Sequence, residues 1–248
     1  MKGRKLLGGL SAFLLILIVG VPPAQALMHP QLTQDDVDRL TEFWQTHEVS
    51  AHVQHSLLAK IGAGEMTDAD RGDINPTHVE TLQRNGNLET VATYPDGSIL
   101  VTALQTSSGE FNTASFPGMS ATRPASIALR AAPTNCQVKS GSGYAVYRNC
   151  TVFGATGTIQ AGFGANYQIV NGGYDSITAH YAPFQQCAGA VCDTPYVAYT
   201  SLQETAGQPA QVTYYFRWTI SAVSATGKVE LFIANDRPTV GFRTKIGR

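Results

Sequence analysis

The chain has 248 residues, of which 43% are hydrophobic, and its 17 Lys and Arg against 18 Asp and Glu give a formal net charge of −1. Nucleic acid is not expected as a partner, because phosphate binding requires concentrated basic charge and the body of the chain holds no Lys/Arg cluster. The length allows one or two domains with a hydrophobic core.

Residues 1–26 predict a secretory signal peptide. A basic start precedes an apolar run and a small-residue cleavage pattern: Lys2, Arg4 and Lys5, then 6–21, then Ala24 and Ala26. An uncleaved membrane anchor is the alternative, but the run is short for a span. Removing the three basic residues from the 17 leaves 14 against 18 acidic ones, a net charge of −4. We therefore expect a secreted, extracellular chain that does not span the membrane.

Residues 27–64 predict an amphipathic helical segment, with one or two helices between about Gln34 and Lys60. Thr33 is a suitable N-cap, and Asp36 stands where its side chain can reach back to the cap. Apolar residues then recur at helical spacing: Val37, Leu40, Phe43, Trp44, Val53, Leu57, Leu58 and Ile61.

Residues 65–133 predict a polar loop at 66–86, a β-hairpin at 88–104 and a linker or extended segment at 107–133. The hairpin turn is Pro95-Asp96-Gly97, in which proline presets φ and glycine takes the left-handed position. A helical turn after Thr67 is compatible with the loop.

Residues 134–248 predict an antiparallel β domain, a sandwich or a barrel, so the fold class expected is α+β. Apolar side chains alternate with polar ones along 159–169 and 212–220, and 171–173 is a turn sequence, Asn-Gly-Gly.

The four cysteines Cys136, Cys150, Cys187 and Cys192 predict disulfides, being an even number in an exported chain. Of three connectivities we favour Cys136–Cys150 and Cys187–Cys192, because each pair is local and brackets turn residues. A zinc site is the alternative, but neither pair has the tight C-x-x-C spacing. Strict alternation across the first pair would place Val138, Val146 and Val152 on the cysteines' face.

Metal-binding patterns are incomplete. His47-Glu48 begins an H-E-x-x-H motif, but His52 comes one residue late, and His52 with His55 lacks a third ligand. Asp68, Asp70 and Asp73 do not match a calcium loop. We predict no metal site and no cofactor.

Catalytic patterns are incomplete as well. No G-x-S-x-G motif occurs. Asp175 and His180 are an odd number of residues apart on an expected strand, so they would face opposite sides. Paired carboxylates for glycoside hydrolysis are poorly supported by spacing. We therefore name no catalytic residue.

Aromatic residues around the second cysteine pair form the candidate binding surface: Tyr174, Tyr181, Phe184, Tyr196 and Tyr199. Aromatics on loops of a rigid scaffold can bind sugars or protein, and core packing is the alternative.

Two stretches carry a resemblance, TVATYPDGSILV and CQVKSGSGYAVYRNCTV with the following FGANYQIVNGGYDSI. They resemble secreted actinobacterial proteins of unassigned function. The resemblance implies export and a disulfide-bearing β domain, and no activity.

Our first hypothesis is thus a secreted, non-catalytic binding or interaction protein that recognises envelope glycan or a protein partner. The alternatives are an exported hydrolase with a site assembled from distant residues, and a secreted toxin or inhibitor.

Overall fold

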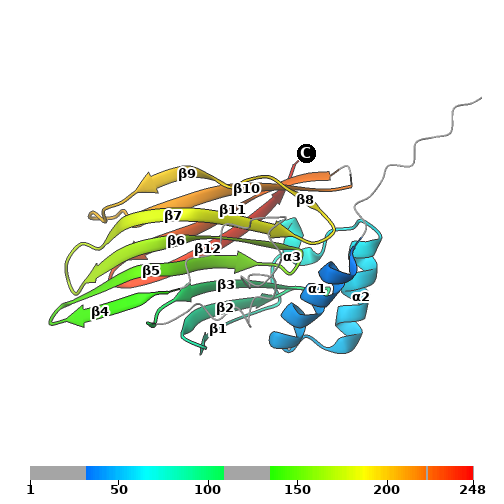
Figure 1. Ribbon diagram of the computed structural model, residues 1–248, viewed down its shortest axis with the longest axis horizontal. Coiled ribbons are helices and arrows are strands. Elements are labelled where there is room, and N and C mark those ends of the chain that lie inside the picture. Colours follow the sequence, from blue (N-terminus) through cyan, green and yellow to red (C-terminus); the bar gives the residue numbers. More distant parts are fainter. Residues whose placement is uncertain (1–31, 109–134, 222, 248) are drawn as a thin grey trace, which may run out of the picture.

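The computed structural model of the chain describes residues 32–108, 135–221 and 223–247. The predicted signal peptide and most of the predicted linker lie outside these residues. Strands dominate the described part, and every strand pairing in it is antiparallel, in two sheets (Figure 1). The prediction of an antiparallel β-rich chain is confirmed. No helix in the described ranges is both long and apolar enough to cross a bilayer.

The first sheet has seven strands in the order β1-β2-β3-β5-β6-β7, with β4 pairing to β5. The strands are β1 (His78–Arg84), β2 (Asn87–Thr93), β3 (Ile99–Gln105), β4 (Gln137–Gly141), β5 (Tyr144–Ala155), β6 (Ile159–Val170) and β7 (Ser176–Cys187).

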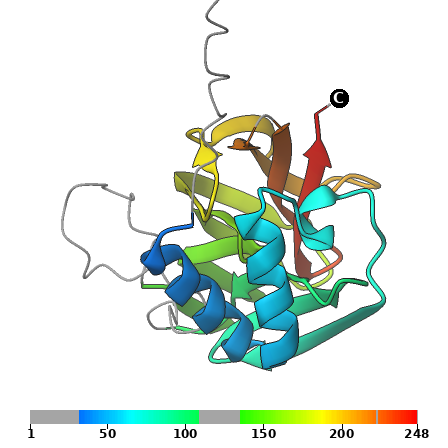
Figure 2. The same cartoon turned by 90° about the vertical axis from the view of Figure 1, so that its right-hand side faces the viewer.

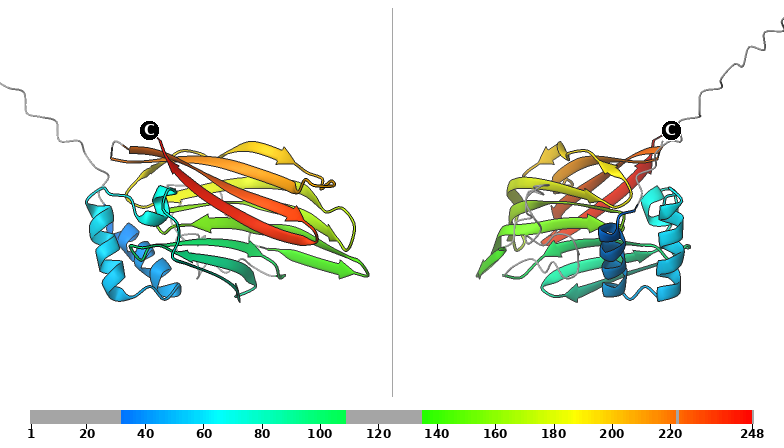
Figure 3. Two further views of the ribbon diagram at one scale, coloured as in Figure 1. Left: turned by 180° about the vertical axis from the view of Figure 1, so that it is seen from behind. Right: turned by 45° about the vertical axis from the view of Figure 1, so that its right-hand side comes forward.

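The second sheet has five strands in the order β12-β11-β10-β8, with β9 also pairing to β10. They are β8 (Val191–Cys192), β9 (Tyr196–Ser201), β10 (Ala210–Ile220), β11 (Val223–Ala234) and β12 (Arg237–Ile246). Seen from behind, β12 crosses in front of the first sheet (Figure 3), where it contacts β3 and β5.

The largest apolar cluster lies between the two sheets. The alternation predicted along β6 and β10 supplies its centre, because every second side chain of each strand points inward. These residues are almost fully buried: Ile159, Ala161, Phe163, Ala165, Tyr167, Val212, Tyr214, Phe216, Trp218 and Ile220. The two inner faces thus pack against each other, and the outer face of the second sheet takes no part in this cluster.

Two helices cover the outer face of the first sheet at one end (Figure 2). Thr33 and Asp36 form a capping box at the start of α1 (Gln34–Thr46), and α2 (Ala51–Gly62) follows. The helices bury Phe43 and Trp44 in a second apolar cluster with Phe153 and other sheet residues. The helices therefore shield part of this outer face, including some of its polar side chains, from solvent.

A third, short helix joins the helical segment to both sheets. Thr67 caps α3 (Asp68–Arg71), as the sequence allowed, and Asp70 is completely buried. Its carboxylate accepts hydrogen bonds from the hydroxyls of Thr67 at 2.7 Å and of Thr156 and Thr158 at 2.5 Å each. This carboxylate fixes α3 to the turn between β5 and β6.

The predicted hairpin at 88–104 is confirmed as β2 and β3, with Gly97 at a φ of 80° in the turn. Its second strand pairs with β5, so the first sheet runs across the boundary drawn at 133/134. The loop predicted at 66–86 is wrong over its second half, which forms β1. Most of β1 is exposed on both faces, so it lacks the alternation that reveals a strand.

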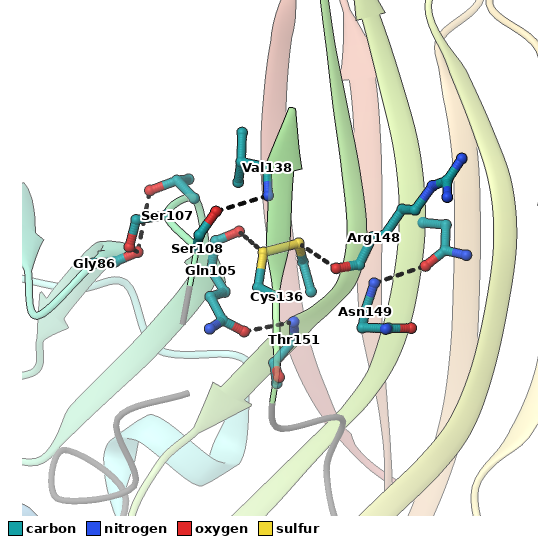
Figure 4. The surroundings of a disulfide bond; sticks show 12 residues. Gly86, Gln105, Ser107, Ser108, Cys136, Val138, Arg148, Asn149 and Thr151 are labelled. Atoms are coloured by element: carbon teal, nitrogen blue, oxygen red, sulfur yellow. Dashed lines mark hydrogen bonds between the residues drawn. A yellow bond between two sulfur atoms is a disulfide. The ribbon is translucent and has the colours of Figure 1, made fainter. Parts of the chain in front are cut away.

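Both predicted disulfides are present, Cys136–Cys150 and Cys187–Cys192. The first lies beside Gln105, whose side-chain carbonyl accepts a 3.4 Å hydrogen bond from the Thr151 N–H (Figure 4). The second joins β7 of the first sheet to β8 of the second.

One detail of the first hairpin was predicted wrongly. Val138 and Val152 contact the inner core, as expected, but Tyr147 takes the place assigned to Val146. A β-bulge between Tyr147 and Cys150, with Asn149 at a φ of 57°, inserts one residue and shifts the alternation.

Candidate binding face

The structure distributes the five predicted aromatic residues over separate places. Tyr174 is 58% exposed in the turn between β6 and β7. Tyr181 lies on the outer face of the first sheet, and Phe184 is buried under the helices. Tyr196 and Tyr199 are exposed on β9, in the second sheet. They do not form one surface.

Tyr181 and Phe184 face the same way although they are three residues apart. A bulge in β7, with Ala182 at a φ of 48°, puts Tyr181 opposite Gly164 and Phe184 opposite Gly162. The Tyr181 hydroxyl donates to the side-chain oxygens of Asn149 and Asn166. Both rings therefore have structural roles that account for them.

Tyr196 belongs to a row of four side chains that crosses the outer face of the second sheet. In register, Tyr196 of β9 lies opposite Tyr215 of β10, Tyr215 opposite Lys228 of β11, and Lys228 opposite Arg243 of β12. We call these four residues the Tyr–Lys–Arg row. Three inter-strand gaps of roughly 4.8 Å make it about 14 Å long.

Neighbouring members of the Tyr–Lys–Arg row contact one another. The rings of Tyr196 and Tyr215 stack with centroids 5.9 Å apart and planes 17° from parallel. The ammonium of Lys228 lies 4.9 Å from the Tyr215 ring centroid, within the range of a cation–π contact. Tyr196 is 60% exposed. The result is a flat aromatic surface that continues directly into positive charge.

A groove of about 720 Å³ adjoins the basic end of this row. Its wall runs from Tyr215 and Lys228 across β12 to the segment after α3, and includes Arg71, Asp73, Arg243 and Lys245. Gly72 comes so close to the Thr244 carbonyl that a Cβ there would overlap it, which fixes this segment against β12. The backbone on this side of the groove is thus held against β12.

Acidic partners balance only part of this charge. Arg71 pairs with Asp73 at 3.1 Å, and Arg243 Nε lies 3.7 Å from the Glu230 carboxylate. Among the described residues, no acid lies within salt-bridge distance of Lys228 or Lys245. Among the described basic residues that line the groove, these two lysines are therefore the uncompensated cations.

The polar pair His47 and Glu89 lies between the helices and the first sheet. Their side chains are 1% and 0% exposed, and His47 Nε2 is 3.8 Å from a Glu89 carboxylate oxygen. Burial lowers the pKa of His47 to about 4 and raises the pKa of Glu89 to about 7. Such values suit acid–base chemistry, but no substrate can reach atoms so deeply enclosed.

The remaining histidines of the described ranges are spread over separate elements and do not gather at one place. His52 and His55 are exposed on α2, whereas His47 follows the end of α1. No group of three or more His, Cys, Asp or Glu in the described residues is arranged to hold a metal ion. His180 faces inward, with Nδ1 2.9 Å from the Tyr214 hydroxyl.

Asp175 and Glu204 converge, but backbone N–H groups occupy their carboxylates. Asp175 accepts from Val170 and Asp236, and Glu204 accepts from Asp175 and Asn235. Burial raises the pKa of Asp175. These carboxylates tie three turns together at one end of the sheets, as buried acceptors usually do.

Three members of the Tyr–Lys–Arg row were missed from the sequence. Tyr215 stands at an outward position of the alternation along 212–220, whereas no sequence pattern marks Lys228 or Arg243. Comparison of the chain with protein-family models, with curated proteins and with solved structures finds no match in any of the three.

Proposed function

We propose that the mature chain is a secreted, non-catalytic protein that binds envelope polysaccharide on the outer face of its second sheet. The two sheets serve, in this proposal, as a β-sandwich scaffold. The observation that carries it is the Tyr–Lys–Arg row, because the exposed Tyr196 stacks on the half-buried Tyr215 on the side of the sheet that faces away from the core.

Sugar is the class of ligand that fits the aromatic half of the row. The C–H groups on one face of a pyranose ring pack against an aromatic ring, while its hydroxyls remain in water. Tyrosine offers such a surface with a polar tip that needs no burial. The row is narrow and extended, which favours a chain of sugar rings over a compact ligand.

A folded protein partner fits the face less well. Stable protein interfaces bury about 800 Å² on each side around a largely apolar centre. The centre of this face instead carries Lys228, Arg243 and Glu230 beside the two tyrosines. The disulfides agree with residence in an oxidising compartment, where envelope polymers are found.

Retention on insoluble cell-wall polysaccharide tests this function. The double variant Tyr196→Ala/Tyr215→Ala should be retained about tenfold less than the wild type, since each ring contact is worth roughly 0.5–1.5 kcal/mol. Tyr174→Ala is the matched control, because Tyr174 is 58% exposed and Tyr196 60% exposed. A wild type that is not retained, or a double variant retained as well as the control, would contradict the proposal.

Two further assays on the same material separate the alternatives. Release of reducing sugar by the wild type would favour an exported hydrolase, and growth inhibition of neighbouring strains would favour a toxin or inhibitor.

A further inference from the structure

We infer that the polysaccharide held by this face is acidic, with carboxylates carried on its sugar rings, as in a uronic acid polymer. This inference rests on the proposed function and adds the chemical class of the ligand. Its basis is the position of the uncompensated cations Lys228 and Lys245 relative to the stacked tyrosines.

The first step concerns charge. The mature chain is acidic, with 14 basic and 18 acidic residues once the predicted signal peptide is removed. The groove nevertheless gathers Arg71, Lys228, Arg243 and Lys245 against Asp73. A local excess of positive charge on an acidic protein raises the local concentration of anions and steers them to that place.

The second step concerns which cations are available. Arg71 is held by the carboxylate of Asp73, to which Nε and Nη2 donate at 3.1 and 3.2 Å. Arg243 is near Glu230. A ligand can approach Lys228 and Lys245 without displacing a protein carboxylate, so these lysines would make the new contacts.

The third step concerns distance. Lys228 lies 4.9 Å from the centroid of Tyr215, the ring that also stacks with Tyr196. A sugar packed on the tyrosines therefore has a cation within about one ring width. A carboxylate attached to that ring, or to the next ring in the chain, meets this requirement without a spacer.

The fourth step concerns direction along the strands. Arg217, Thr226 and Lys245 form the next outward row, two residues along β10, β11 and β12. Two residues of strand rise about 7 Å. Lys228 and Lys245 both line the groove and are offset diagonally on neighbouring strands, which suits anionic groups that repeat along a polymer better than a single small anion.

The test measures the affinity of the full mature chain for three soluble polymers of matched length: polygalacturonate, neutral dextran and inorganic polyphosphate. We expect polygalacturonate to bind at least tenfold more tightly than dextran and polyphosphate, with an affinity that falls as salt rises from 0.05 to about 0.5 M because exposed charges are screened.

The double variant Lys228→Gln/Lys245→Gln should lose about fivefold to tenfold of the affinity for polygalacturonate and most of its salt dependence, as expected for two exposed charge contacts. Lys139→Gln removes an exposed lysine on β4 of the other sheet and should change nothing.

Equal binding of dextran and polygalacturonate would overturn the inference, because charge would then not select the ligand. Tighter binding of polyphosphate would overturn the assignment to ring-borne carboxylates. Tyrosine-dependent retention on cell-wall polysaccharide, without binding to polygalacturonate, would overturn this inference alone. A wild-type chain that is not retained on cell-wall polysaccharide would instead contradict the proposed function.

Discussion

His47 and Glu89 share one buried site, with His47 Nε2 3.8 Å from Glu89 Oε2. Loss of hydration is the main cause of both pKa shifts, to about 4 for His47 and about 7 for Glu89. The carbonyl of Phe43 partly opposes the shift of His47, and the charge of Arg84 lowers both values. Arg84 is anchored by its own 2.6 Å hydrogen bond to the Thr46 carbonyl.

These shifts have opposite consequences for stability. Between about pH 4.5 and 6.5 the folded pair contains a neutral imidazole and a neutral carboxylic acid, whereas the unfolded chain carries an imidazolium and a carboxylate. Each state binds one proton. The pair therefore leaves the free energy of unfolding nearly independent of pH in this window.

Glu89→Gln should expose the contribution of His47. The pKa of His47 is lower in the folded chain than in the unfolded chain. Between these two pKa values the unfolded chain therefore holds the His47 proton and the folded chain does not. The free energy of unfolding of this variant should rise by about 3 kcal/mol as pH increases from about 4 to 6.5. Urea titrations at several pH values measure it.

His47→Gln should do the opposite. The folded pKa of Glu89 lies above its unfolded value, so stability should fall as pH rises from about 4.5 to 7. His52→Gln, at an exposed position on α2, is the control and should keep the wild-type profile. If both buried variants also keep that profile, the neutral pair does not exist.

Asp70→Ala should lower the free energy of unfolding by about 3–5 kcal/mol. The change leaves the buried hydroxyls of Thr67, Thr156 and Thr158 without their shared acceptor, and each unsatisfied group costs roughly 1–3 kcal/mol. Asp73→Ala is the control, since its side chain is 61% exposed and surface pairs contribute little. If Asp70→Ala lowers the free energy of unfolding as little as Asp73→Ala does, the Asp70 contacts contribute little to stability.

Removing the disulfides should cost unequal amounts. With sequence separations of 14 and 5, chain entropy gives about 3 kcal/mol for Cys136–Cys150 and about 2 kcal/mol for Cys187–Cys192. Paired Cys→Ala variants, unfolded in urea, provide the comparison. Peptide mapping without reduction should recover both local links, and any crossed link would refute the connectivity.

Local chemistry explains what the sequence could predict. The turn at Pro95–Gly97, the capping box of Thr33 and Asp36 and the two short-range disulfides depend on residues close together in the chain. Strand alternation also identified the inner core, because the inner residues of β6 and β10 keep a strict period of two.

The errors arise where one inserted residue or a distant partner decides the outcome. The bulges at Asn149 and Ala182 reverse the faces of Val146 and Phe184 without a clear mark in the sequence. The burial of Glu89 depends on helices that are distant from it in the sequence. The Tyr–Lys–Arg row depends on the register of four strands, which no single segment encodes.

The binding face can be tested most directly by NMR, by mapping the backbone amides that shift when cell-wall polysaccharide fragments are added to the labelled mature chain. We expect the largest shifts at Tyr196, Tyr215, Lys228 and Arg243, on four adjacent strands of the second sheet. Shifts centred instead on Tyr174 or Tyr181, with the row unchanged, would contradict it.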